Sequence, residues 1–200
     1  IKLVEKIGQS YIHAYLLCNL GQVLRENQEL QEAEIVLSEA LDIAKNQGDL
    51  QLEAICLNDL ALTSLQQNQV ARAMQQAQES LEKFEVLGVK LSTTSNLALL
   101  ATIQLRLGNY AEAQKYADET IRILEECKGE GPDYPHRDYW SCYNVYRALG
   151  KYEAARSALS AAYRLLMNQA QLITNSAMRE SYLENISYHR QIINESKQYQ

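Results

Sequence analysis

The residues best suited to catalysis or metal binding in this sequence are its three histidines. His13, His136 and His189 stand far apart, and none has a second ligand-type residue at a metal-binding spacing such as H-x3-H or H-E-x-x-H. The sequence contains no G-x-S-x-G motif and no G-x-x-x-x-G-K-[ST] loop to hold phosphate. We therefore expect no enzyme active site, no metal and no cofactor.

The cysteines point to a reducing environment. Cys18, Cys56, Cys127 and Cys142 include no C-x-x-C pair. At this chain length and low cysteine content, a disulfide framework is not expected. We expect reduced thiols in a cytoplasmic protein, with structural packing as the main role of the cysteines in helical segments.

One stripe of side chains is suited to binding. Arg137, Trp140, Asn144 and Arg147 are three, four and three residues apart, which places them on one face of a helix. Trp and Arg often carry binding energy at interfaces, and two arginines beside a tryptophan suit a carboxylate or an extended acidic peptide. The alternative is that Trp140 packs against a capping helix and both arginines form surface ion pairs.

The composition favours helices as the elements that position these residues. The chain has 200 residues, only two Pro and eight Gly, and it is rich in Leu, Ala, Gln and Glu. A net charge of −6 without a dense Lys/Arg block argues against nucleic acid and membrane surfaces as partners. The longest apolar runs are far below the ~18 residues needed to span a bilayer. Because position 1 is Ile, we expect a fragment of a longer chain.

Small residues recur with a period of forty. Gly8, Gly48 and Gly88 are forty residues apart, and each helical segment carries an anchor alanine followed by a second small residue seven positions later. The anchors are Ala33, Ala73, Ala113 and Ala155, and the second small residues are Ala40, Ser80, Thr120 and Ala162. Seven residues make two helical turns, so both small residues face a partner helix that can approach closely.

The partner helix lies upstream of each anchor. Twelve residues before the first three anchors stand Gly21, Ala61 and Ala101, and the fourth unit has Tyr143 instead. Gly108 and Gly150 fall between the two helices of their units, where a left-handed C-cap is expected. The Gly-Asn-Tyr stretch at 108–110 is therefore interpreted as a joint between helices.

These units resemble tetratricopeptide repeats, whose pattern is W-x2-L-G-x2-Y…A-x3-F…A…P. The first unit matches this pattern with Leu17, Leu20, Gly21, Leu24, Ala33, Leu37 and Ala40, and three further units match it in part over roughly residues 10–170. A period of forty is similar to the longer-period type found in bacterial signalling ATPases, transcriptional regulators and kinesin light chains.

The resemblance implies an all-α helical-hairpin repeat solenoid, a right-handed superhelix of about four units with a C-terminal capping helix. We expect residues 1–8 to be the tail of a preceding repeat helix. Four helix pairs are expected within 9–172, at 10–48, 50–88, 91–128 and 137–172, with capping helices at 173–200. The segment GEGPDYPHRD, 129–138, is expected to be a long inter-repeat loop or, alternatively, a binding loop.

The resemblance also implies a non-catalytic scaffold that binds a peptide or protein segment in a concave groove lined by the first helix of each pair. The groove residues carried over unit by unit are Tyr15, Asn19, Gln22, Asn58, Asp59, Leu62, Thr102, Arg137, Trp140, Asn144 and Arg147. The partner is expected to be a protein, a peptide or another domain of a larger cytoplasmic parent, with a homodimer possible.

Two alternatives stay open. One is a sensor or regulatory domain of a signalling ATPase or transcriptional regulator that binds a small ligand or an adjoining domain. The other is a structural spacer or self-association domain.

Overall fold

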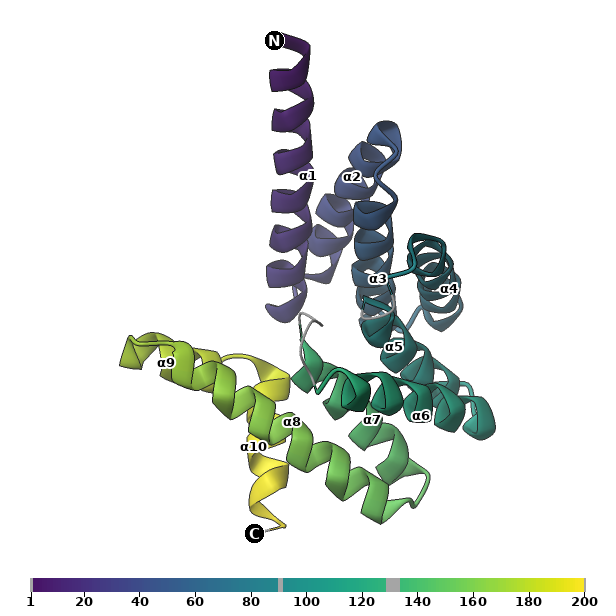
Figure 1. Cartoon of the computed structure of the whole chain (residues 1–200), viewed down its shortest axis with the longest axis vertical. Helices are drawn as coiled ribbons and strands as arrows, with labels where there is room; N and C mark the ends of the chain where they lie inside the picture. Colours follow the sequence, from purple (N-terminus) through teal and green to yellow (C-terminus); the bar gives the residue numbers. More distant parts are fainter. Residues whose placement is uncertain (1, 90–91, 129–133, 200) are drawn as a thin grey trace. The chain divides into compact units, whose positions relative to one another are not determined.

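The computed structural model describes residues 2–89, 92–128 and 134–199, with side chains described from residue 12 onward. These residues form ten α-helices and no strand (Figure 1). The expected all-α class is confirmed. Among the described residues, no helix is long and apolar enough to cross a membrane.

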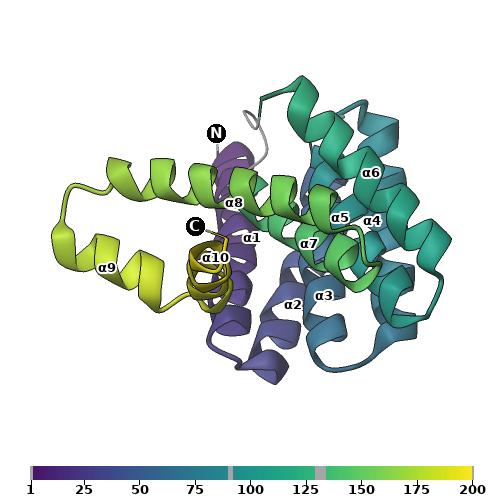
Figure 2. The same ribbon diagram turned by 90° about the horizontal axis from the view of Figure 1, so that it is seen from below.

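The first eight helices follow one another as four pairs. The pairs are α1 (Lys2–Glu26) with α2 (Leu30–Gln47), α3 (Leu50–Gln66) with α4 (Val70–Leu87), α5 (Thr93–Arg106) with α6 (Tyr110–Glu126), and α7 (Pro135–Ala148) with α8 (Tyr152–Leu172). Two shorter helices, α9 (Ser176–Glu184) and α10 (Ser187–Lys197), complete the chain (Figure 2). The chain divides into two compact units, Ile1–Asn96 and Leu97–Gln200, and the boundary falls within α5.

The helix crossings form where the sequence places small residues. In the first pair, a Cβ atom added at Gly21 would lie 2.4 Å from Cγ of Leu37, so only glycine permits this approach of α1 to α2. In the second pair the corresponding residues are Ala61 and Ala77, both fully buried. The close approach of the two helices that the sequence predicts at Gly21 is present in the first pair.

The turns within the pairs are joints, as the sequence predicts. Gly108 has φ 78° and the surroundings of its Cα are open. The amide of Gly108 donates to the carbonyl of Leu105, and that of Asn109 donates to Gln104. This is the Schellman arrangement that ends a helix, and Gln28 and Asn68 adopt the same left-handed conformation with φ 66° and 60°.

Two segments differ from the predicted boundaries. Helix α1 runs without a break from Lys2 through Gly8 to Glu26, whereas the sequence predicts a junction near Gly8. The assignment of residues 1–8 to a preceding repeat stays a prediction. Half of the GEGPDYPHRD segment, residues 129–133, lies outside the described residues, and α7 begins at Pro135.

The second unit ends in the expected capping helices. Helix α10 packs against α7 and α8. Its Ile192 is fully buried in one apolar cluster with Tyr143 and Leu166. This contact covers the last helix pair in the way that a terminal repeat must be covered.

Candidate functional site

A buried ion pair holds one predicted groove residue of the first unit inside the protein. Arg25 Nη1 of α1 donates to Asp59 Oδ1 of α3 at 2.7 Å, and Gln22 Nε2 donates to Asp59 Oδ2 at 2.8 Å. Arg25 and Asp59 are each 2% exposed. Burial lowers the pKa of Arg25, but the Asp59 carboxylate outweighs it and raises the pKa. Asp59 therefore joins α1 to α3 and offers no charge to a partner.

The other predicted groove residues of the first compact unit differ in their exposure to solvent. Asn19 is exposed, while Tyr15, Gln22 and Leu62 are half-buried. Asn58 is buried, and its Oδ1 atom has no hydrogen-bond partner within the described part of the chain. A hydrogen bond joins Gln22 to another predicted residue, Asp59.

The predicted stripe on α7 is partly covered by the cap. Trp140 is only 9% exposed and stacks on Tyr143, with ring centroids 4.9 Å apart. The Tyr143 hydroxyl donates to Glu195 Oε2 of α10 at 2.8 Å, and Arg147 Nη1 lies 3.2 Å from Glu195 Oε1. Burial and this hydrogen bond raise the pKa of Tyr143. For Arg147 and Trp140 the structure therefore matches the alternative of an ion pair beside a buried tryptophan.

The other members of the predicted set stay accessible. Arg137 is half-buried, with its guanidinium 4.8 Å from the centroid of the Tyr134 ring, a cation–π contact. Asn144 is exposed and donates from Nδ2 to the Trp140 carbonyl at 2.9 Å. Thr102 is half-buried and donates to the Ala98 carbonyl at 3.0 Å. A binding role for these residues stays a prediction.

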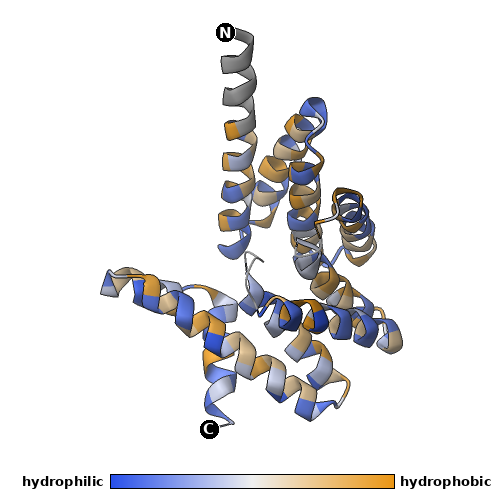
Figure 3. Ribbon diagram, viewed as in Figure 1, coloured by the Kyte–Doolittle hydropathy of each residue, from blue (hydrophilic) through white to orange (hydrophobic). Residues whose placement is uncertain are grey.

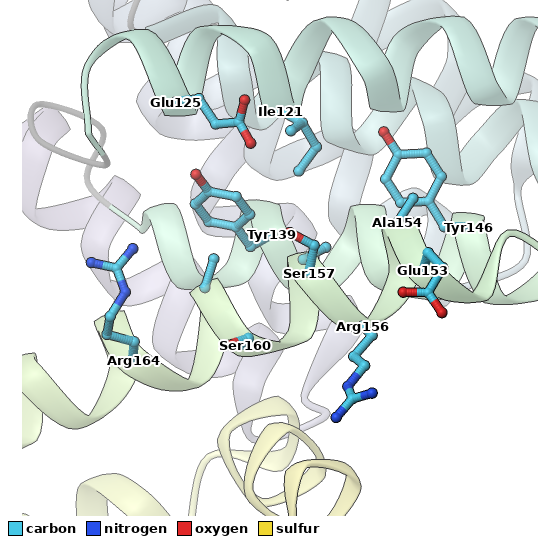
Figure 4. A pocket seen from close by; sticks show the side chains of 12 residues that line it. Ile121, Glu125, Tyr139, Tyr146, Glu153, Ala154, Arg156, Ser157, Ser160 and Arg164 are labelled. Carbon is cyan, nitrogen blue, oxygen red and sulfur yellow. The ribbon is translucent and has the colours of Figure 1, made fainter. Parts of the chain in front are cut away.

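Sequence reasoning missed a groove between α6 and α8 in the second unit. Its volume is about 720 Å³, and the rings of Tyr139 and Tyr146 on α7 lie between the two walls (Figure 4). The walls consist of Ile121 and Glu125 from α6 and of Glu153, Ala154, Arg156, Ser157, Ala158, Ser160, Ala161 and Arg164 from α8. All of these residues belong to the second unit.

On the α8 wall, the groove is lined by small residues where the aligned positions of α6 carry large ones. Aligned on the anchors Ala155 and Ala113, the positions on α8 are Ala154, Ser157, Ala158 and Ala161, and those on α6 are Glu112, Lys115, Tyr116 and Glu119. A comparison of these two helices in the sequence would have provided the signal for the groove.

The groove presents both charges and a phenol. Burial raises the pKa of Tyr139 to about 12, with a further rise from Glu125 that Arg164 opposes. The Tyr146 hydroxyl donates to Asp118 Oδ1 at 2.7 Å, so burial and this bond raise its pKa as well. Among the described residues, no ion pair involves the groove residues Glu125, Glu153, Arg156 or Arg164. These four charges are free to contact a polar partner.

The comparisons with known proteins agree with the architecture. Residues 12–85 match the family model described as tetratricopeptide repeat. Residues 12–85 therefore contain tetratricopeptide repeats. No curated protein matches the sequence.

Solved structures share the helical fold of this chain at low identity. BtubC (BKLC) from P. vanneervenii has a TM-score of 0.61 and 20% identity, over 78% of this chain and 64% of that one. The TPR-like repeats of a Podosopora anserina protein assigned as a kinesin light chain have a TM-score of 0.58 and 15% identity, over 92% and 88%. A variant of that protein gives the same values. At these identities the likeness concerns the fold.

A histidine pair joins the fourth helix pair to its cap. His136 Nε2 of α7 lies 3.0 Å from His189 Nε2 of α10, and His189 Nδ1 lies 2.7 Å from the Tyr182 carbonyl. Because a carbonyl only accepts, His189 Nδ1 carries the proton and His136 Nε2 donates to the neutral His189 ring. Burial, followed by the repulsion from Arg137 and from His189 when it is protonated, lowers the pKa of His136 to about 3. No group of three or more potential metal ligands occurs among the described residues.

Proposed function

We propose that this chain is a non-catalytic tetratricopeptide module that binds a segment of another protein, as part of a larger cytoplasmic protein. The groove between α6 and α8 is the observation that supports it best. It is open, it has a volume of about 720 Å³, and its side chains include hydroxyls and unpaired charges. It offers hydrogen-bonding and ionic groups without a nucleophile and base held together for catalysis.

The charges of the groove indicate what kind of segment fits. Arg164 and Glu125 stand on opposite walls near the Tyr139 hydroxyl, while Arg156 and Glu153 both come from α8 (Figure 4). The two cations and two carboxylates balance, so a strongly acidic or basic peptide would meet repulsion from one pair. The segment that fits best is therefore polar and carries both charges, with its acidic side chain toward Arg164.

The test is site-specific photo-crosslinking in cells of the source organism. A photo-reactive amino acid at Ser160, which is exposed on the α8 wall, should capture a partner protein. Arg164→Glu should remove at least about 90% of this product, because two like charges in contact cost several kcal/mol and about 1.4 kcal/mol already weakens binding tenfold. The matched control Lys151→Glu changes an exposed charge outside the groove and should leave the yield unchanged.

Equal capture by both variants would overturn the groove as the binding site. The second place to examine is the predicted stripe on α7, where Arg137 and Asn144 remain accessible. Loss of the partner on Arg137→Glu, but not on Arg164→Glu, would move the site to that stripe.

A small-molecule sensor is the second candidate function. The groove volume falls within the range of ~300–1,000 Å³ that is usual for small-molecule sites. A metabolite that raises the Tm of the wild type but not of Tyr139→Phe would support this reading, because that change removes only the phenol hydroxyl in the groove.

A further inference from the structure

Helix α1 carries an apolar stripe that its own unit leaves open. Ile12, Leu16, Leu20 and Val23 are 60%, 59%, 46% and 57% exposed. Their spacing of four, four and three residues places them on one helix face. Figure 3 shows hydrophobic residues along this part of α1. Scattered exposed apolar residues are common, but a continuous stripe marks a contact surface.

The next repeat shows what covers the same face. Forty residues later the corresponding positions on α3 are Leu52, Cys56, Leu60 and Thr63, and they are 0%, 0%, 2% and 0% exposed. Helix α2, the second helix of the preceding pair, packs against α3. Leu52, Cys56 and Leu60 form one apolar cluster with Leu37, Ala40, Leu41 and Ala44 of α2.

Two later first helices are covered in the same way. Asn96 of α5, forty residues after Cys56, lies with its Nδ2 atom 3.5 Å from the carbonyl of Ala77 on α4. Cys142 of α7, thirteen residues before its anchor as Leu20 is before Ala33, lies with its Sγ atom 3.7 Å from the Ala117 carbonyl on α6. In each case a second helix from the preceding pair occupies the face that α1 leaves open.

In the part of the chain that the structure describes, a second copy has no free helix of that kind. Helix α2 already packs on α3, α6 on α7, and α8 on α10, while α4 accepts Asn96. The stripe is therefore complementary to a second helix that belongs to a different hairpin.

We propose that the α1 stripe is the docking face for a further helical hairpin of tetratricopeptide type. The hairpin would lay its second helix along Ile12, Leu16, Leu20 and Val23. That helix would carry small residues seven positions apart, as Ala33 and Ala40 do on α2. The proposal rests on the register of the repeats and is independent of the groove on α8.

The test extends the chain by one repeat. A copy of residues 9–48 is inserted in frame before Gln9. The copied α2 then directly precedes the original α1, and the two repeats keep the spacing of forty residues. Because stacked repeats stabilise their neighbours, amide exchange around Leu16 and Leu20 should slow by about tenfold or more. The urea midpoint of the chain should rise as well.

The matched control is the same extended chain with Leu16→Glu and Leu20→Glu in the original α1. Leu16 and Leu20 are 59% and 46% exposed in the unextended protein. The same two substitutions should therefore leave the helicity of the unextended protein unchanged. In the extended chain the slower exchange should disappear. Unchanged exchange after extension, or equal slowing in the control, would overturn the proposal. So would a dimer of the unextended chain that Leu16→Glu and Leu20→Glu dissociate, because the occupant would then be a second copy.

Discussion

At the scale of single residues, the close approach of α1 to α2 depends on a pair of side chains. Gly21 faces Leu37 in the first repeat, and Ala61 and Ala77 hold the corresponding places in the second. The sequence predicts the crossing point, because small residues recur there with the period of forty. The sequence does not show that Gly21 lies against Leu37, because this contact depends on the distance between the two helices.

Gly21→Ala should destabilise the first unit. The new Cβ would lie 2.4 Å from Leu37 Cγ. Overpacking of this kind costs about 1–3 kcal/mol, which exceeds the gain of about 1 kcal/mol from alanine's helix propensity. Urea denaturation would measure the effect.

The second arm of this experiment uses Leu37→Ala as the background. There Gly21→Ala produces an Ala–Ala pair like Ala61 and Ala77, so the same substitution should stabilise the protein. A double-mutant cycle with no coupling between positions 21 and 37 would contradict this account of the crossing.

The residues that sequence reasoning placed less well are those with partners far along the chain. Asp59 stands at a groove-lining position by repeat register, but Arg25, thirty-four residues earlier, draws it into a buried ion pair. Trp140 was expected in an open groove, and Glu195 of α10 covers that region through Tyr143 and Arg147. Periodicity predicts helix faces, but not which nonperiodic segment packs on them.

At the scale of the helices, a buried histidine pair helps to attach α10 to α7. His136 of α7 and His189 of α10 are each 1% exposed, and Tyr188 stacks on His136 with centroids 5.8 Å apart. The sequence predicts a capping helix at this end, because the repeat pattern stops there. It does not predict the histidine pair, because the two residues are fifty-three positions apart.

We expect the cap to loosen as the pH falls below about 6.5. The pKa of His136 is about 3 in the folded chain, against an ordinary value of 6.5. Between pH 3 and pH 6.5, His136 binds a proton in the unfolded chain but stays neutral in the folded chain. The stability from neutral His136 is therefore complete above pH 6.5 and is lost as the pH falls toward 3, by up to about 1.4 kcal/mol per pH unit.

The measurement is the urea midpoint at pH 7 and pH 5, where most carboxylates remain ionised. His136→Gln should remove much of the decrease between these values. His13→Gln, which alters an exposed histidine of the first unit, should keep it. The groups around the pair, Arg137, Asp138, Tyr188 and Tyr182, are unchanged in both variants. An equal decrease in all three proteins would show that His136 does not control the transition.

At the scale of the whole molecule, the repeats are divided between two compact units. The period of forty predicts the helix pairs and their joints, and the structure confirms the pairs. The boundary between the two units, at Asn96 and Leu97, falls within α5 and has no counterpart in the forty-residue period. A local pattern cannot reveal it, because compactness depends on contacts summed over many residues.

The closed end of the second unit can be tested with one buried and one exposed side chain. Ile192→Ala should cost about 2–5 kcal/mol, because Ile192 is fully buried beside α7 and α8. Leu172→Ala, at a position 81% exposed, should change stability by less than about 0.5 kcal/mol. Hydrogen exchange should show the loss of protection in α7 and α8 for the first variant. If both variants behave alike, α10 does not close this end.

The single tryptophan gives the second unit an optical signal of its own. Trp140 is the only Trp in the 200 residues, and it stacks on Tyr143, whose hydroxyl is bonded to α10. Its emission therefore reports the melting of the last helix pair and its cap, whereas far-UV circular dichroism averages over all the helices. Where the two signals fail to coincide during denaturation, the two units unfold in separate steps.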